Sequence, residues 1–175
     1  MKPNIVFLDR DGIINVRLVD DYVKSWKEFK FLPNVFDSIK LLNKNGFEVI
    51  VISNQGGISK GLFSFEELMK IDKKMCQEIV KNSGRILKSF YCPHQDIDKC
   101  SCRKPNSGLL FQAKKEFDID LKKSWMIGDS ERDVLAGKGA GCRNILVTDD
   151  LDVKTEADYT AGDLFSAVGV IMAHG

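Results

Sequence analysis

Short apolar runs alternate along the chain with segments of helical periodicity. Apolar runs that end abruptly are typical of strands buried on both faces of a parallel sheet. The clearest run covers residues 5–8, and another, rich in β-branched residues, covers residues 47–52. Further strands are predicted at residues 88–91, 125–127 and 145–147, with an edge strand at residues 158–160.

The segments between these runs carry apolar residues at helical spacing. Helices are predicted at residues 33–45, 107–117 and 131–138 and from about residue 163. The longest helix begins after Ser64, which together with Glu67 has the pattern of a capping box, and extends to about residue 82. Its core-facing stripe is predicted to comprise Phe65, Leu68, Ile71, Met75 and Ile79.

Strands that alternate with helices predict an α/β fold, a Rossmann-like three-layer sandwich with a mostly parallel central sheet and helices on both faces. Connections in such a sheet are expected to be right-handed crossovers. No linker divides the chain, so we expect one domain over residues 1–175. The segment 12–33 is too short to hold a large cap domain.

Composition narrows the function classes without choosing among them. Of the 175 residues, 43% are hydrophobic and 29% are charged, and 26 basic residues balance 25 acidic ones to a formal net charge of +1. That balance indicates no nucleic-acid-binding surface. The sequence shows neither a signal peptide nor an apolar run near the roughly 20 residues of a membrane span. We expect a cytoplasmic protein with no nucleic-acid or membrane partner, acting as a monomer.

Two carboxylates follow the first strand directly. Asp9 comes after the last apolar residue of the run, and Asp11 follows two residues later, ahead of Gly12. Ligands bind at the carboxyl ends of strands in open α/β sheets, so this position favours a functional role. One carboxylate could attack an electrophile while the other moves protons, and both could bind Mg²⁺ through oxygen. The simpler alternative is local hydrogen bonding in a turn.

Polar residues also follow two other predicted strands. Ser53, Asn54 and Gln55 come after one strand and precede two glycines, a combination that suits a phosphate group. Asp129 follows another strand and could complete a Mg²⁺ site, whereas a helix N-cap is its simpler role. Lys104 precedes a predicted helix and could neutralise a phosphoryl group. With the first two carboxylates, these residues make the set that phosphoryl transfer through a metal-bound aspartate requires.

Two close pairs of metal-ligand residues, separated by five residues, predict a zinc site. The four residues are Cys92, His94, Cys100 and Cys102. Three thiolates and one imidazole make a closed tetrahedral site with no open position, which is typical of structural Zn²⁺. Its predicted task is to order the zinc loop, about residues 92–102, which leads into Arg103 and Lys104. The alternative is a reduced loop without metal.

The four motifs at these strand ends resemble those of the haloacid dehalogenase (HAD) superfamily of phosphatases. They comprise residues 9–12, 53–55, Lys104 and 128–133, occur in the expected order and span nearly the whole chain. With the zinc loop, the pattern resembles the subgroup of D-glycero-D-manno-heptose 1,7-bisphosphate phosphatases and histidinol-phosphate phosphatase domains. The resemblance implies a Mg²⁺-dependent phosphomonoesterase that forms an aspartyl phosphate, acts on a small phosphorylated metabolite and has no large cap.

The resemblance also implies roles for individual residues. Asp9 is expected to be the nucleophile and a Mg²⁺ ligand, and Asp11 the general acid and base that also binds Mg²⁺ through its backbone carbonyl. Asp129 is expected to be the remaining Mg²⁺ ligand. Ser53 and Lys104 are expected to stabilise the phosphoryl group. Substrate contacts are expected from Asp20, Tyr22, Asn54, Gln55 and Arg103, and the segment 17–22 is expected to border the sugar site.

Some positions depart from the family pattern. Ile13 stands where threonine is usual, and Ser130 stands where heptose phosphatases often have lysine. The zinc loop is short, as in the histidinol-phosphate phosphatases, whereas Arg103 and the absence of a fused dehydratase favour the heptose bisphosphate. We expect removal of the C7 phosphate of D-glycero-D-manno-heptose 1,7-bisphosphate. Histidinol phosphate is the alternative substrate, and a catalytically inactive, zinc-stabilised binding module is the alternative class.

Overall fold

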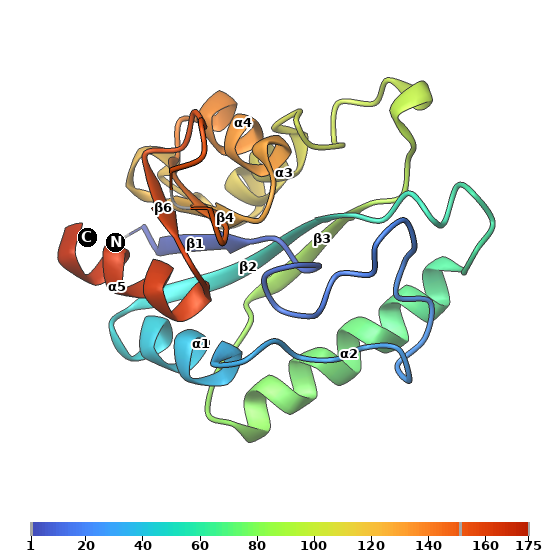
Figure 1. Cartoon of the computed structure of the whole chain (residues 1–175), viewed down its shortest axis with the longest axis horizontal. Coiled ribbons are helices and arrows are strands. Elements are labelled where there is room, and N and C mark those ends of the chain that lie inside the picture. Colours follow the sequence, from blue (N-terminus) through green and yellow to red (C-terminus); the bar gives the residue numbers. More distant parts are fainter. Residues whose placement is uncertain (1, 151, 175) are drawn as a thin grey trace.

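A computed structural model describes residues 2–150 and 152–174 of the chain. Six strands pair in parallel to form a sheet in the order β3-β2-β1-β4-β5-β6 (Figure 1). Their bounds are β1 Asn4–Leu8, β2 Phe47–Asn54, β3 Lys88–Cys92, β4 Trp125–Gly128, β5 Arg143–Val147 and β6 Tyr159–Ala161. Every predicted strand is therefore present, and the predicted parallel α/β sheet is confirmed.

Helices cover both faces of the sheet, as the alternating pattern predicts. Their bounds are α1 Val35–Lys44, α2 Phe65–Lys81, α3 Gly108–Phe117, α4 Glu131–Ala140 and α5 Leu164–His174. Two short 3₁₀ turns, η1 Asp96–Asp98 and η2 Leu121–Lys123, have no counterpart in the prediction. In Figure 1, α1, α2 and α5 lie below the sheet, and α3 and α4 lie above it. The three-layer arrangement is thus confirmed.

Alternate residues of the central strands fill two separate cores. Val6 and Leu8 of β1 face the core that contains α1, α2 and α5. Ile5 and Phe7 face the opposite core, which contains α3 and α4. All four side chains have no exposed surface. A strand with both faces buried requires an uninterrupted apolar run. The strand could therefore be predicted from the sequence.

The start of α2 differs from the prediction in two respects. Ser64 accepts a hydrogen bond from the backbone N–H of Glu67 (3.1 Å), but the Glu67 carboxylate pairs with Lys70 (3.1 Å) instead of returning to Ser64. The predicted capping box is therefore only half formed. Phe65 is 48% exposed and does not join the buried stripe of this helix. Leu68, in the same helical turn, is fully buried, so helical spacing alone placed only the Phe65 ring incorrectly.

The strand order creates a crevice at the centre of the sheet. β1 is flanked by β2 on one side and by β4 on the other. The chain runs outward from β1 through β2 to β3 and then crosses back to β4, so the direction of winding reverses at β1. Loops separate at such a switch point and leave room for a ligand at the carboxyl ends of the strands. Among the described helices, none is long and apolar enough to cross a membrane.

Candidate active site

One buried lysine connects the carboxylates that follow β1 and β4. Lys104 Nζ lies 2.9 Å from Asp9 Oδ1 and 2.5 Å from Asp133 Oδ1. It also donates to the Ile52 carbonyl at the end of β2 (2.9 Å). The backbone N–H of Asp9 donates to the Ile127 carbonyl (3.0 Å), so β4 fixes the backbone position of Asp9. Three neighbouring strands thus hold this centre in place.

The pKa values of Asp9 and Lys104 are both raised, but for different reasons. Burial, with Asp133 and Asp129 nearby, raises the pKa of Asp9 to about 7, although Lys104 opposes the shift. Burial alone would lower the pKa of Lys104, but Asp133 and Asp9 outweigh it and raise that pKa. The lysine therefore stays cationic, and the carboxylates exceed the positive charge available to them. Such a site favours an additional cation.

Asp11 lies in a different environment from Asp9. Its carboxylate accepts hydrogen bonds from Arg10 Nη2 (3.0 Å to each oxygen), Asn15 Nδ2 (2.9 Å) and Gln55 Nε2 (2.7 Å). Burial opposes ionisation, but the Arg10 guanidinium and these hydrogen bonds outweigh it and lower the pKa of Asp11. Two neighbouring acids therefore have pKa values moved in opposite directions, which suits a division of roles between them.

The residues after β2 organise the site from one side. Ser53 is buried, and its hydroxyl accepts from Gln55 Nε2 (3.0 Å). Gln55 has no exposed surface and connects Ser53 to Asp11, so its side chain does not line the pocket. Asn54 clamps the backbone of Lys104, accepting from its N–H and donating to its carbonyl (3.0 Å each). Of the predicted substrate contacts, Gln55 is thus placed behind the catalytic groups.

Two glycines are required where the backbones approach the acids. Gly12 has φ +91°, and a Cβ there would lie 2.0 Å from Asp129 Oδ2. A Cβ at Gly128 would lie 2.1 Å from Asp133 Cβ. Only glycine fits such close approaches. The carboxylates of Asp129 and Asp133 are therefore packed directly against the backbone of the β1 and β4 ends.

The acids that could hold Mg²⁺ gather at this point. One oxygen from each of Asp9, Asp129 and Asp133 lies within 4.8 Å of the others. Asp133, however, already accepts from Ser130 N–H (3.1 Å) and Ser130 Oγ (2.6 Å) and binds Lys104. Asp9 and Asp129 are therefore the carboxylates best suited to bind a hard cation through oxygen. The Asp11 side chain is outside this group because it faces Arg10.

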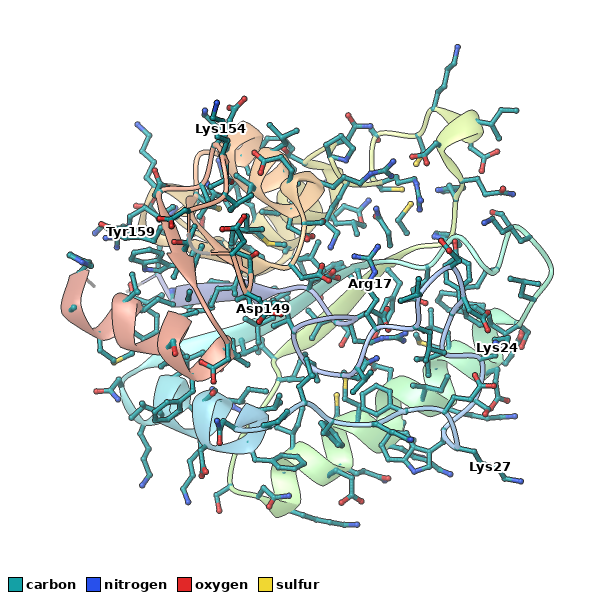
Figure 2. The ribbon with its side chains drawn as sticks, in the orientation of Figure 1. Arg17, Lys24, Lys27, Asp149, Lys154 and Tyr159 are labelled. Carbon is teal, nitrogen blue, oxygen red and sulfur yellow. The ribbon has the colours of Figure 1, made fainter. Side chains whose placement is uncertain are left out.

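Arg17 lies beside one of these acids. Its Nη1 is 3.2 Å from Asp129 Oδ2, and the side chain is 61% exposed. Figure 2 shows Arg17 near the centre of the view, on the long loop between β1 and α1. Burial and Asp133 raise the pKa of Asp129, and Arg17 opposes that shift. The Arg17 guanidinium, on a solvent-exposed side chain, thus partly neutralises the group of acids.

We expect Arg17→Ala to tighten Mg²⁺ binding. The ion pair between Arg17 and Asp129 must be disrupted before the carboxylate binds a metal. Loss of such an exposed pair should raise the affinity for Mg²⁺ by roughly 2- to 5-fold. Isothermal titration of metal-free protein with Mg²⁺ measures the effect. Lys60→Ala is the matched control, since it removes a pocket cation that lies over the Tyr22 ring (5.3 Å) instead of on an acid. Equal affinities in the two variants would contradict the expectation.

The four predicted zinc ligands converge on a single point. Cys102 Sγ lies 3.3 Å from Cys92 Sγ and 3.4 Å from Cys100 Sγ, and His94 Nδ1 lies 3.3 Å from Cys102 Sγ. Tetrahedral ligation with Zn–S bonds of about 2.3 Å places sulfurs roughly 3.8 Å apart, close to this spacing. The cysteines are free thiols. The donor set therefore fits Zn²⁺ with no position left for water.

The zinc loop is connected directly to the pocket. Arg103 Nη1 donates to the His94 carbonyl (2.9 Å). Burial opposes ionisation of Cys100, but hydrogen bonds from the Arg103 backbone N–H and Cys102 outweigh it and lower the pKa of Cys100 to about 7. One ligand is thus readily a thiolate near neutral pH, the form that binds metal.

A cavity of about 460 Å³ opens above the catalytic groups. Of the residues predicted from sequence, it is lined by Asp9, Asp11, Asp20, Tyr22, Ser53, Asn54, Arg103, Lys104 and Asp129. Its rim also carries Arg17 and Asp21, which belong to the segment 17–22 predicted to border the sugar site. Lys60, Asp96 and Arg132 line it as well, and no role was predicted for these three. No local pattern marks Asp96 or Arg132, because their contacts join segments far apart in the chain.

Comparison with known proteins first defines the class. Residues 101–166 match the family model described as HAD-hydrolase-like. A solved D,D-heptose 1,7-bisphosphate phosphatase from B. bronchiseptica, complexed with magnesium and phosphate, superposes with a TM-score of 0.90 at 31% identity. That similarity covers 98% of this chain and 99% of the solved one. The predicted resemblance to HAD phosphatases is therefore confirmed.

Curated relatives then define the family. A D-glycero-α-D-manno-heptose-1,7-bisphosphate 7-phosphatase of Campylobacter jejuni is 34% identical over 91% of this chain and 89% of the relative. A D-glycero-β-D-manno-heptose-1,7-bisphosphate 7-phosphatase of Haemophilus influenzae is 35% identical over 93% and 91%. The chain belongs to the family of D-glycero-D-manno-heptose-1,7-bisphosphate 7-phosphatases.

Proposed function

We propose that this protein hydrolyses the C7 phosphate of D-glycero-D-manno-heptose 1,7-bisphosphate in the cytoplasm. The convergence of Asp9, Asp11, Ser53, Lys104 and Asp129 in one pocket carries the proposal. A binding module without catalysis would have no need to keep two acids with oppositely shifted pKa values. The relatives that match most of the chain are named for this activity.

The chain's own groups supply the steps of the reaction. Asp9 attacks phosphorus, the bond from phosphorus to the C7 oxygen breaks, and Asp11 gives that oxygen a proton. Water then attacks the aspartyl phosphate, Asp11 takes its proton, and phosphate leaves with Asp9 restored. Ser53 and Lys104 hold the phosphoryl oxygens throughout. Mg²⁺, bound by Asp9, Asp129 and the Asp11 backbone carbonyl, would neutralise charge on the transferred group.

The two roles of Asp11 require different protonation states. Its lowered pKa keeps the carboxylate ionised in the free site, which suits the base step. An arriving phosphate brings negative charge close to Asp11, and a nearby like charge raises the pKa of an acid. Substrate binding therefore prepares Asp11 to carry the proton that the leaving oxygen needs.

The zinc loop has a supporting role in this proposal. Zn²⁺ held by Cys92, His94, Cys100 and Cys102 would fix the loop that carries Arg103 to the pocket. The coordination is closed, so the metal contributes order and not chemistry. The hydrogen bond from Arg103 Nη1 to the His94 carbonyl supports this role.

A substrate panel tests the proposal. Phosphate release is measured with both anomers of heptose 1,7-bisphosphate and with histidinol phosphate, at equal concentrations with Mg²⁺. We expect kcat/KM for one heptose bisphosphate anomer to exceed that for histidinol phosphate by at least about 100-fold, a difference of ~2.7 kcal/mol in transition-state binding. EDTA should stop release, and added Mg²⁺ should restore it. A preference for histidinol phosphate, or activity without Mg²⁺, would overturn the assignment.

A further inference from the structure

Arg17 is held at the site by a single contact. Its Nη1 donates to Asp129 Oδ2 (3.2 Å), and among the described residues its guanidinium has no other hydrogen-bond partner. The Arg17 side chain is 61% exposed, whereas that of Asp129 is only 17% exposed. An ion pair that is long and open to water on one side is weak. The guanidinium can therefore leave Asp129 at little cost.

The backbone next to Arg17 is fixed, so movement is confined to the side chain. Val16 N–H donates to the Lys30 carbonyl (2.8 Å). Asn15 Nδ2 donates to the Asp11 carboxylate and to the Val16 carbonyl, at 2.9 Å each. A change of rotamer is then enough to move the Arg17 guanidinium within the cavity that it lines.

Formal charge explains why the contact should break when the metal site fills. Three carboxylates, when ionised, face two cations at this centre: Asp9, Asp129 and Asp133 against Lys104 and Arg17. A divalent cation changes the total from −1 to +1, so both neighbouring cations are repelled. Lys104 is buried and is bound to Asp9 at 2.9 Å and to Asp133 at 2.5 Å, so it stays in place. Arg17, with its one exposed contact, is the group that yields.

A phosphoryl group carried by Asp9 would lie within reach of the released guanidinium. One oxygen of Asp129 lies within 4.8 Å of an oxygen of Asp9, whose carboxylate attacks phosphorus in the proposed reaction. Among the described residues, Arg17 Nε and Nη2 have no hydrogen-bond partner. A planar guanidinium with free N–H groups binds phosphate oxygens well. Ser53 and Lys104 would hold the phosphoryl group from the sheet side, and Arg17 from the loop.

We propose that Arg17 exchanges partners when the metal site fills: its guanidinium leaves Asp129 and binds the phosphoryl group that is transferred to Asp9. This inference rests on the proposed function, which places that group at Asp9. Arg17 is then a competitor of the metal in the free protein and a substrate-binding residue in the loaded one. The exchange makes metal binding favour phosphate binding beyond the attraction between the two ions themselves.

Titration with inorganic phosphate, the product of the reaction, tests the proposal by isothermal calorimetry. In saturating Mg²⁺ we expect phosphate to bind Arg17→Ala roughly 10-fold more weakly than wild type, the size of one lost charge-assisted hydrogen bond. Mg²⁺ itself should bind the same variant more tightly, because its competitor is gone. Opposite effects of one substitution on the two ligands are the signature of the exchange. A phosphate affinity within about twofold of wild type would overturn it.

A second measurement separates a contact from a general loss of positive charge. Saturating phosphate should raise the affinity of the wild-type protein for Mg²⁺, and linkage requires Mg²⁺ to raise the affinity for phosphate by the same factor. A charge that acts only through its field weakens phosphate binding with and without metal, and leaves this factor unchanged. The exchange predicts a factor at least about threefold smaller in Arg17→Ala than in wild type. An unchanged factor would overturn the contact with the phosphoryl group.

Lys27→Ala is the matched control. Lys27 is exposed, lies on the same loop outside the cavity, and is well separated from Arg17 in Figure 2. Both affinities should equal those of wild type, and changes like those in Arg17→Ala would overturn the inference. Circular dichroism confirms that each variant is folded. Because the probes are Mg²⁺ and phosphate alone, a failure here leaves the proposed function in place, whereas failure of the substrate panel leaves these affinities unchanged.

Discussion

Asp9→Asn should reduce phosphate release at least about 100-fold, a loose bound for a missing nucleophile at ~1.4 kcal/mol per decade. The amide keeps the shape of the side chain but cannot form the acyl phosphate. Release is measured with saturating heptose 1,7-bisphosphate and Mg²⁺. Retention of more than about a hundredth of wild-type turnover would show that another residue attacks phosphorus.

The same variant should remain fully folded. The pKa of Asp9 is raised to about 7, so its charged form is disfavoured in the folded, metal-free protein at pH 8 relative to the unfolded chain. A neutral amide removes that cost, and Lys104 keeps Asp133 as a partner. We expect the melting temperature of Asp9→Asn in metal-free buffer to equal or exceed that of wild type. Asp37→Asn, in the first turn of α1, is the control for a carboxylate outside the pocket.

Cys102→Ser should lower bound zinc well below one equivalent and reduce kcat/KM by about 10-fold or more, as losses of metal-supported positioning commonly do. The effect should lie more in KM than in kcat. Asn54 clamps the Lys104 backbone independently of the loop, whereas Arg103 depends on the His94 carbonyl and on Asp96. Elemental analysis of protein purified without added metal gives the zinc content.

Cys76→Ser provides the control for thiol loss, since Cys76 lies in α2, apart from the four clustered ligands. Its zinc content and kinetics should match those of wild type. Wild-type protein with far less than one equivalent of zinc and full activity would contradict the zinc assignment. Stability is expected to fall in Cys102→Ser as well, because zinc binding and local folding are coupled.

The sequence was most informative about the buried strands and about the acidic residues that directly follow them. Ile5 and Phe7 face one core, and Val6 and Leu8 face the other, so all four residues are apolar. Such a strand can be predicted from its own residues alone. Asp9 and Asp129 were recognisable for the same reason, because each follows directly on such a strand. Strand ends in a parallel sheet come together whatever the intervening loops do.

The sequence did not reveal what depends on contacts between distant side chains. Arg132 meets Asp96 only because α4 and the zinc loop lie on the same side of the pocket. Gln55 follows Ser53 and Asn54 in an apparent phosphate loop, yet its side chain is buried behind them. Phe65 has the right spacing for a core position, but at the start of its helix the ring is about half exposed. The periodicity of apolar residues describes a single helix or strand. It does not show which side chains of different elements come into contact.

Pairing between β1 and β4 also determines when activity can arise during synthesis. The Asp9 backbone is fixed by the Ile127 carbonyl, which belongs to the far half of the chain. A ribosome releases the N-terminal segments first, and contacts distant in sequence form late. A nascent chain that has only β1, α1 and β2 contains Asp9 but lacks β4, the strand whose Ile127 carbonyl fixes the Asp9 backbone. The Asp9 backbone therefore lacks its hydrogen-bond partner until β4 has been synthesised and has entered the sheet beside β1.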